Sequence, residues 1–317
     1  MHTQKAGVLL ERGLYRHFGG YAIELASGWN PNETSDSAAR YVARDIHDWR
    51  MWLDSEDDGI SRTLRCYGLH EQLSSDAFAA ALADVRERVD GTVPVVDVGA
   101  NIGYYALLEA AVLGEQARVF AIEPAPDNLE LLTRNVRSNG LETTVEVEQC
   151  AIGGTNEPVE LRLSNYSNRH TVRELPGDVW RSGCQHDRER VEVPQRTVDR
   201  FVADRGLSPA DVAAVRMDLE GYETAVVEGM EGVLDADGPL VVFVELHPVL
   251  SDAELDDVLS AFDRGGLSVV SAVVDESVAG TNHTMKWRGV DLHAESFEEV
   301  AAAIRETDRP VELVASR

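Results

Sequence analysis

One stretch, residues 95–105, constrains the fold of this chain more than any other. An apolar run there ends in an acid, passes through Gly99 and Gly103, and continues as a helical pattern of apolar residues. Such a pattern predicts a strand, a tight turn and a helix. In an open α/β sheet a turn of this kind lies at the carboxyl end of a strand, where ligands bind. Glycine lets the backbone adopt positive φ or approach a ligand closely, so we expect both glycines to belong to a binding site.

The residues around the two glycines indicate which kind of ligand fits. A dinucleotide fingerprint requires a second glycine two positions after the first, so that a pyrophosphate rests on bare backbone. Asn101 occupies that position, and Asp97 at the strand end would repel a pyrophosphate. The same carboxylate would attract the ammonium group of S-adenosylmethionine. The turn therefore favours a cationic nucleoside without phosphate and disfavours a nicotinamide-dependent reductase.

A second acid follows at the spacing expected for a ribose contact. Residues 118–124 contain another short apolar run that ends at Glu123, about twenty residues after the turn. One carboxylate at that place accepts hydrogen bonds from both ribose hydroxyls. Pro126 then opens a predicted helix, because proline is favoured in the first helical turn. We therefore expect Glu123 to bind the ribose of the cofactor.

Four motifs in register resemble those of a known family. They read DVGANIGY at residues 97–104, EP at 123–124, CAIG at 150–153 and MDLEGYE at 217–223. In order and spacing, from about residue 58 to residue 248, the chain resembles the FkbM family of S-adenosylmethionine-dependent methyltransferases. The resemblance implies O-methyl transfer to hydroxyls of sugars and polyketides. It also places Cys150 and Ala151 beside the adenine ring.

The apolar runs, read together with this resemblance, predict a doubly wound, seven-stranded, Rossmann-like α/β sheet. The expected strands lie at residues 95–98, 118–124, 143–149, 213–218, 239–248, 267–274 and 310–315. An N-terminal extension, residues 1–75, is expected to precede the methyltransferase domain, residues 76–317. Residues 164–194 lose all periodicity. We expect them to form a lid that recognises the acceptor, with simple disorder as the alternative.

Three polar residues at the ends of the predicted fourth and fifth strands are the candidates for catalysis. Asp218 ends the fourth strand beside the cofactor turn, facing the place where the transferred methyl group is expected. Glu245 and His247 lie at the exit of the fifth strand and, being two residues apart, point to the same face. They form an acid–base pair or part of a metal site, or they close the sheet through a structural hydrogen bond. We expect these three residues to carry out catalysis and assign no metal ligand, and the sequence leaves a metal requirement open.

A hydroxyl acceptor needs a base, because a sugar or alkyl hydroxyl is a poor nucleophile at neutral pH. His247 or Asp218 would take the proton, with Glu245 orienting the histidine. A carboxylate acceptor would need no base, so the sequence leaves ether and ester products open. The acceptor is expected to be a sugar, a glycan or another small molecule. A cofactor-binding regulatory protein without turnover is the alternative.

The charge balance is strongly acidic, with 56 acidic against 29 basic residues and a net charge of −27. Lys5 and Lys286 are the only lysines, and Arg216 stands where relatives typically carry lysine. An acidic, lysine-poor surface resembles that of proteins from salt-accumulating haloarchaea, where high ionic strength screens the self-repulsion. The lack of a basic patch disfavours a nucleic-acid partner. The lack of lysines in the motifs disfavours a lysine-dependent ribose methyltransferase.

The remaining sequence features concern location. No apolar run reaches the roughly eighteen residues of a membrane span, and the N-terminal residues show no secretory signal pattern. Cys66, Cys150 and Cys184 lack the spacing of a disulfide framework or a zinc site, which suits a reducing cytoplasm. We therefore expect a cytoplasmic protein. The oligomeric state does not follow from the sequence.

Overall fold

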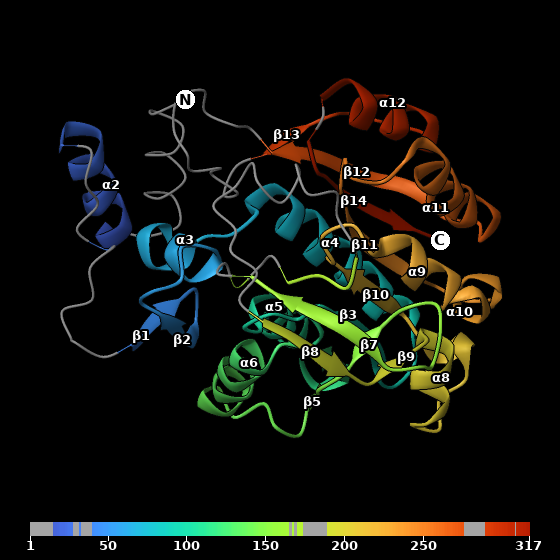
Figure 1. Cartoon of the computed structure of the whole chain (residues 1–317), viewed down its shortest axis with the longest axis horizontal. Helices are drawn as coiled ribbons and strands as arrows, with labels where there is room; N and C mark the ends of the chain where they lie inside the picture. Colours follow the sequence, from blue (N-terminus) through green and yellow to red (C-terminus); the bar gives the residue numbers. More distant parts are fainter. Residues whose placement is uncertain are drawn as a thin grey trace.

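The computed structural model describes residues 15–27, 32, 40–164, 167, 170–173, 189–275, 289–307 and 309–317. Within these residues the central feature is a mixed sheet of eight strands in the order β13-β12-β14-β11-β10-β3-β4-β5 (Figure 1). The strands from β11 to β5 are parallel, whereas β14 runs antiparallel to both of its neighbours. Along the chain, β4 and β5 are added on one side of β3, and β10 and the later strands are added on the other side. The predicted doubly wound, Rossmann-like α/β fold is confirmed.

All seven predicted strands are present. They are β3 (Val93–Val98), β4 (Ala117–Ile122), β5 (Val145–Glu148), β10 (Ala214–Met217), β11 (Val241–Leu246), β12 (Ser268–Asp275) and β14 (Val311–Ser316). An eighth strand, β13 (Gly289–Asp291), adds three residues at the edge of the sheet. The sequence did not indicate it, because three residues are too short to show the alternation of a strand.

Neighbouring residues of the central strands enter two separate cores on opposite faces of the sheet. In β3, Val95 packs into one core and Val96 into the other. One face is covered by α4 (Gln72–Arg88), α5 (Tyr104–Leu113) and α6 (Pro126–Ser138). The other is covered by α8 (Val198–Ala203), α9 (Glu223–Glu228), α10 (Glu231–Asp235), α11 (Asp252–Arg264) and α12 (Phe297–Thr307). Because helices cover both faces, β3 and β11 are buried at every residue and read as continuous apolar runs.

Helix ends follow the polar signals of the sequence. The Ser251 hydroxyl accepts a hydrogen bond from the Glu254 amide, and the Glu254 carboxylate accepts one from the Ser251 amide, which together cap α11. Pro126 opens α6 as predicted. Single-turn helices η1 (Gly114–Gln116) and η2 (Pro209–Asp211) precede β4 and β10.

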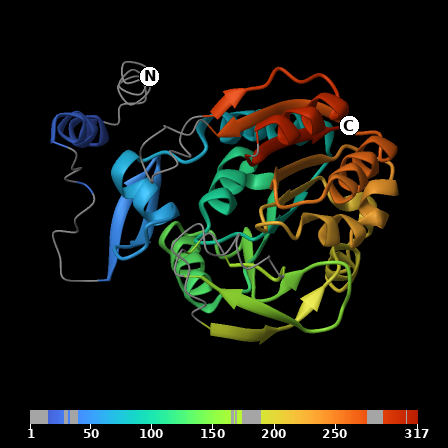
Figure 2. The same ribbon diagram turned by 45° about the horizontal axis from the view of Figure 1, so that its top comes forward.

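The N-terminal part contributes α2 (Tyr15–Ser27), the antiparallel pair β1 (Tyr41–Ile46) and β2 (Trp49–Asp54), and α3 (Ile60–Tyr67). Figure 2 shows this hairpin beside α6 at one side of the sheet. The Asn135 side chain of α6 accepts a hydrogen bond from the Trp52 amide at 2.6 Å, and Arg134 lies over the Trp52 ring. Trp52 thus packs on the domain. Since α4 begins before residue 75, the predicted boundary would cut one helix, and the division into two parts stays a prediction.

Two smaller sheets lie beyond β5. In the first of them, β7 (Val159–Leu163) pairs antiparallel with β8 (Glu189–Val193). β6 (Ala151–Ile152) pairs with β9 (Gln195–Arg196). Most of the predicted lid, residues 164–194, and the segment 276–288 lie outside the described residues. Among the helices that the structure describes, none has the length and apolar character needed to cross a membrane.

Candidate active site

A pocket opens where β3, β4 and β10 end. The sheet extends from β3 toward β4 on one side and toward β10 on the other, so this is the topological switch point at which open α/β sheets bind ligands. The space between the protein atoms, including the open mouth, is about 590 Å³. Six of the residues predicted to bind the cofactor line it: Gly99, Asn101, Glu123, Cys150, Ala151 and Asp218.

The glycine turn after β3 needs its glycines for two different reasons. Gly99 has φ +77°, and a Cβ atom there would lie 2.5 Å from the Asp218 carbonyl oxygen, so no other residue fits between the two strand ends. Gly103 has φ +91° and precedes α5, where a Cβ atom would lie 2.7 Å from a Leu132 methyl group. Gly103 shapes the turn and does not line the pocket. Asn101, with φ +51°, is a residue type that tolerates the left-handed region.

Glu123 is held rigidly at the pocket wall. Its two carboxylate oxygens accept hydrogen bonds from the backbone amides of Asn101 and Ala125, each at 2.8 Å. Burial raises the pKa of the Glu123 carboxyl to about 7, although these amide hydrogen bonds oppose the rise. Each oxygen retains a further lone pair for a ligand. The carboxylate is therefore positioned to accept two hydroxyl groups, as the ribose prediction requires.

Asp97 is paired with a residue that the sequence analysis did not connect to it. The Asp97 side chain is fully buried and does not line the pocket. Arg216 donates a hydrogen bond to Asp97 Oδ1 at 3.2 Å and another to the Gly99 carbonyl at 3.0 Å. A second nitrogen of Arg216 donates to Asp218 Oδ2 at 3.2 Å. Direct contact between Asp97 and a cofactor stays a prediction, whereas its contact with Arg216 ties the ends of β3 and β10 together.

A signal for this ion pair was present in the sequence. Asp97 and Arg216 are charged residues inside two buried strands, and such charges need a partner. The parallel register places Arg216 directly opposite Asp97. Register cannot be read from one strand alone, so the pairing became visible only in the structure.

Cys150 and Ala151 form an apolar part of the wall. Both are buried and line the pocket. Burial raises the pKa of the Cys150 thiol to about 12, so the sulfur stays protonated and unreactive at neutral pH. This placement agrees with a packing role for Cys150, while the contact of both residues with adenine stays a prediction.

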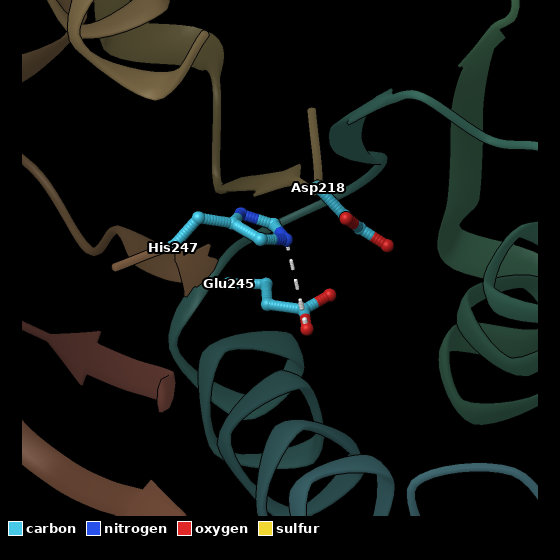
Figure 3. Close-up of side chains that lie close together, drawn as sticks. All are labelled: Asp218, Glu245 and His247. Carbon is cyan, nitrogen blue, oxygen red and sulfur yellow. Dashed lines mark ion pairs between the residues drawn. The ribbon is translucent and has the colours of Figure 1, made fainter. Parts of the chain in front are cut away.

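The three predicted catalytic side chains come together beside the pocket. One oxygen of Asp218, one oxygen of Glu245 and one ring nitrogen of His247 lie within 4.8 Å of one another. Figure 3 shows their polar ends turned toward a common point, with the His247 ring nitrogen Nε2 facing Glu245 at 3.8 Å. Glu245 and His247 are buried, and Asp218 is partly exposed at the pocket.

The residue that orients His247 is Glu223 rather than the predicted Glu245. His247 Nδ1 lies 2.7 Å from Glu223 Oε1, whereas Glu245 is beyond hydrogen-bond distance. Burial alone would lower the pKa of His247, but Glu223, Glu245 and Glu220 together hold it well above its ordinary value. These carboxylates thus favour the protonated form of the His247 ring. Glu223 begins α9, and the sequence analysis did not connect it with His247.

The start of the predicted lid meets the pocket. Ser167, His170 and Thr171 line it. The Ser167 carbonyl accepts hydrogen bonds from the side-chain amides of Asn101 and Asn128, at 3.2 and 2.8 Å. His170 Nδ1 accepts a hydrogen bond from the Ser164 amide.

A comparison with known families decides the identity. The model of the methyltransferase FkbM domain matches residues 97–268, more than half of the chain. The chain belongs to the FkbM methyltransferase family. Membership confirms the predicted methyltransferase class and the predicted cofactor, S-adenosylmethionine.

Two curated relatives of this FkbM protein carry methyltransferase names. Hexuronic acid methyltransferase AglP of Haloferax volcanii is 27% identical over 166 residues, which cover 52% of this chain and 60% of that protein. Methyltransferase sdnD of Sordaria araneosa is 26% identical over 160 residues, covering 43% of this chain and 60% of that protein. The chain thus spans about three fifths of the length of both relatives. Among solved structures, a SAM-dependent methyltransferase from Agrobacterium tumefaciens aligns with a TM-score of 0.44 and 9% identity, covering 89% of this chain and 71% of that one.

Proposed function

We propose that this FkbM protein transfers a methyl group from S-adenosylmethionine to an oxygen of a sugar, a glycan or another small molecule. The observation that carries the proposal is a single pocket with the fixed Glu123 carboxylate on its wall and Asp218 at the end of the neighbouring strand. A nucleoside bound through Glu123 would direct its far end toward Asp218, Glu245 and His247.

The residues of the pocket fit this cofactor. Glu123 accepts the two ribose hydroxyls, Cys150 and Ala151 provide an apolar surface for a base, and Gly99 leaves room for close approach. Bound S-adenosylmethionine supplies an electrophilic methyl carbon on a sulfonium sulfur. The task of the chain is then to place an acceptor oxygen in line with that carbon and to exclude water.

Proton transfer is assigned to Asp218. An O–C bond forms while the S–C bond breaks, and a hydroxyl acceptor loses its proton during the attack. The surrounding carboxylates favour the protonated form of His247, which makes Asp218 the better acceptor of that proton. Asp218 lies at the pocket, and Arg216 donates a hydrogen bond to its Oδ2. If the acceptor is a carboxylate, no proton moves.

Two observations support a sugar or glycan as the acceptor, namely the name of one relative and the position of the segment 164–194. AglP is named for methyl transfer to a hexuronic acid, and a uronic acid offers both hydroxyl and carboxyl oxygens. The first residues of the segment 164–194 line the pocket, which supports acceptor recognition by this segment.

The acidic surface supports a halophilic protein without a nucleic-acid partner. The three cysteines lack the spacing of a disulfide framework, which supports a reducing compartment such as the cytoplasm.

The test is calorimetric titration of S-adenosylmethionine, and separately of NADH, into the protein in molar KCl. We expect saturable binding of S-adenosylmethionine that Glu123→Ala abolishes, with the exposed Glu157→Gln as a control that leaves it unchanged. Transfer of a radiolabelled methyl group to uronic-acid glycosides is then measured. Preferential NADH binding would overturn the methyltransferase proposal. Binding without transfer to any sugar, and with Asp218, Glu245 and His247 all dispensable, would instead support a regulatory protein.

A further inference from the structure

The cluster of Asp218, Glu245 and His247 has the dimensions of a metal site. The two strands that carry these residues, β10 and β11, are adjacent and parallel, so their ends meet. One ligating atom from each residue lies within 4.8 Å of the other two. Two ligand atoms of one divalent cation, each at about 2.0–2.3 Å from it, lie at most about 4.5 Å apart. Shifts of a few tenths of an ångström therefore suffice for all three to bind one ion.

His247 is held as metal-binding histidines are held. Its Nδ1 is bound to the buried Glu223 carboxylate at 2.7 Å, which fixes the ring and directs Nε2 into the cluster. A carboxylate that binds the second ring nitrogen is the usual partner of a metal-bound imidazole. The side chain of His247 is only 7% exposed, and Nε2 makes no hydrogen bond to any described residue. It lies 3.6 Å from Glu220 and 3.8 Å from Glu245, beyond hydrogen-bond distance.

The charges around the cluster favour a cation. Asp218, Glu220, Glu223 and Glu245 surround one imidazole, and Arg216 contacts Asp218 among them. An acceptor oxygen that carries negative charge would be repelled by these carboxylates. A divalent cation held between them would attract the same oxygen.

We propose that Asp218, Glu245 and His247 bind one divalent cation of the Mn²⁺ or Mg²⁺ type, and that this cation holds the acceptor oxygen. Two carboxylates and one neutral imidazole suit such hard or borderline ions, with the remaining positions open to water or substrate. Because only the neutral ring can bind a metal, His247 releases its Nε2 proton to solvent when the cation binds. The role in acceptor binding rests on the proposed methyl transfer, whereas cation binding itself does not. With the ion present, Asp218 is a ligand. A cation-bound hydroxyl then releases its proton to water more readily.

The experiment is a Mn²⁺ titration of the cofactor-free full chain in molar KCl, followed by the electron paramagnetic resonance signal of free Mn²⁺. High salt screens the acidic surface and so weakens unspecific binding of Mn²⁺ there. A specific site then appears as saturable binding of one Mn²⁺ per chain. We expect Glu245→Gln and His247→Gln each to weaken binding by at least about tenfold. The exposed Glu157→Gln removes the same charge and should leave binding unchanged. Equal binding by Glu245→Gln and the wild type, or no saturable site, would overturn the proposal.

A second measurement needs no variant and so does not depend on the variants folding. In ¹⁵N-histidine spectra of the wild type, substoichiometric Mn²⁺ should broaden one imidazole, that of His247, before the others among the nine histidines. Uniform broadening would contradict a site at His247. The outcomes also separate this site from the proposed function. Mn²⁺ binding without methyl transfer would leave the site standing, while full transfer in a chelator with no Mn²⁺ binding would remove the site and keep the methyltransferase.

Discussion

Replacing Glu123 by glutamine tests the electrostatics of the pocket most directly. Burial raises the pKa of this carboxyl from an ordinary 4.5 to about 7. A group whose pKa is higher in the folded state stabilises the fold below its unfolded pKa, and this contribution is lost as the pH rises through the folded pKa. The wild type should therefore lose stability between about pH 4.5 and pH 7 through Glu123, and Glu123→Gln should not.

The size of the effect follows from the two pKa values. A tenfold difference in proton affinity corresponds to about 1.4 kcal/mol, so the rise to about 7 amounts to about 3 kcal/mol over the whole range. The isoelectric point of about 4.6 makes the lowest pH values impractical. Between about pH 5.5 and pH 8 the expected change is about 2 kcal/mol. In Glu123→Gln the side-chain NH₂ group faces a backbone amide that donates to Glu123 in the wild type. This contact lowers the free energy of unfolding by an amount that does not depend on pH.

The assay is urea unfolding of the wild type, Glu123→Gln and the exposed control Glu157→Gln in molar KCl at both ends of that pH range. Differences between proteins cancel the titration of all other groups. We expect the free-energy difference between the wild type and Glu123→Gln to change by about 2 kcal/mol, and that of the control to stay constant. Parallel pH curves for the wild type and Glu123→Gln would refute the buried-carboxyl argument.

Cofactor affinity provides a second readout of the same carboxyl. A protonated carboxyl offers one acceptor oxygen less to the ribose, so wild-type affinity for S-adenosylmethionine should fall by up to about tenfold per pH unit below pH 7. Glu123→Gln should bind weakly at every pH. Undiminished affinity of Glu123→Gln at pH 8 would show that Glu123 does not hold the ribose.

Other perturbations test the turn, the ion pair and the surface. Gly99→Ala places a methyl group 2.5 Å from a carbonyl oxygen and should destabilise the protein by about 3 kcal/mol in thermal unfolding, whereas Gly91→Ala, with a similar φ and open space around it, should cost about 1 kcal/mol. Equal losses of stability in the two variants would show that the Asp218 carbonyl can move away from the added methyl group. Arg216→Met leaves the buried Asp97 carboxylate unpaired and should cost about 3–5 kcal/mol by denaturant unfolding, clearly more than the surface change Arg305→Met. The acidic surface predicts a melting temperature that rises steadily from dilute buffer to molar KCl, and an unchanged value would contradict a halophilic protein.

The strand ends could be predicted from the sequence because burial and position are local properties. A buried strand reads as an apolar run, and a polar residue at its end must lie at the edge of the sheet. For that reason Glu123, Asp218, Glu245 and His247 were all expected near one site, and the structure places them there. The start of the segment 164–194 was likewise expected at the pocket from its loss of periodicity.

What could not be predicted depends on contacts between segments far apart in the chain. The pairing of Asp97 with Arg216 depends on the register of two strands separated by more than one hundred residues. The contact of Glu223 with His247 depends on how the first turn of α9 is placed against the end of β11. Local sequence patterns give no information on these two contacts, because each joins segments far apart in the chain. The sequence therefore identified the residues of the site but not the residues that pair with them.

The position of β14 has a consequence for how the chain folds during synthesis. β14 is made after the other strands of this sheet, yet it lies between β11 and β12 and pairs with both. Until it leaves the ribosome, β11 and β12 each expose an unpaired edge, and the two cannot complete one sheet. Exposed strand edges are sites of aggregation. The nascent chain therefore passes through a stage in which its cofactor half is fully synthesised while the sheet still has a gap, and chaperone protection is most needed at that stage.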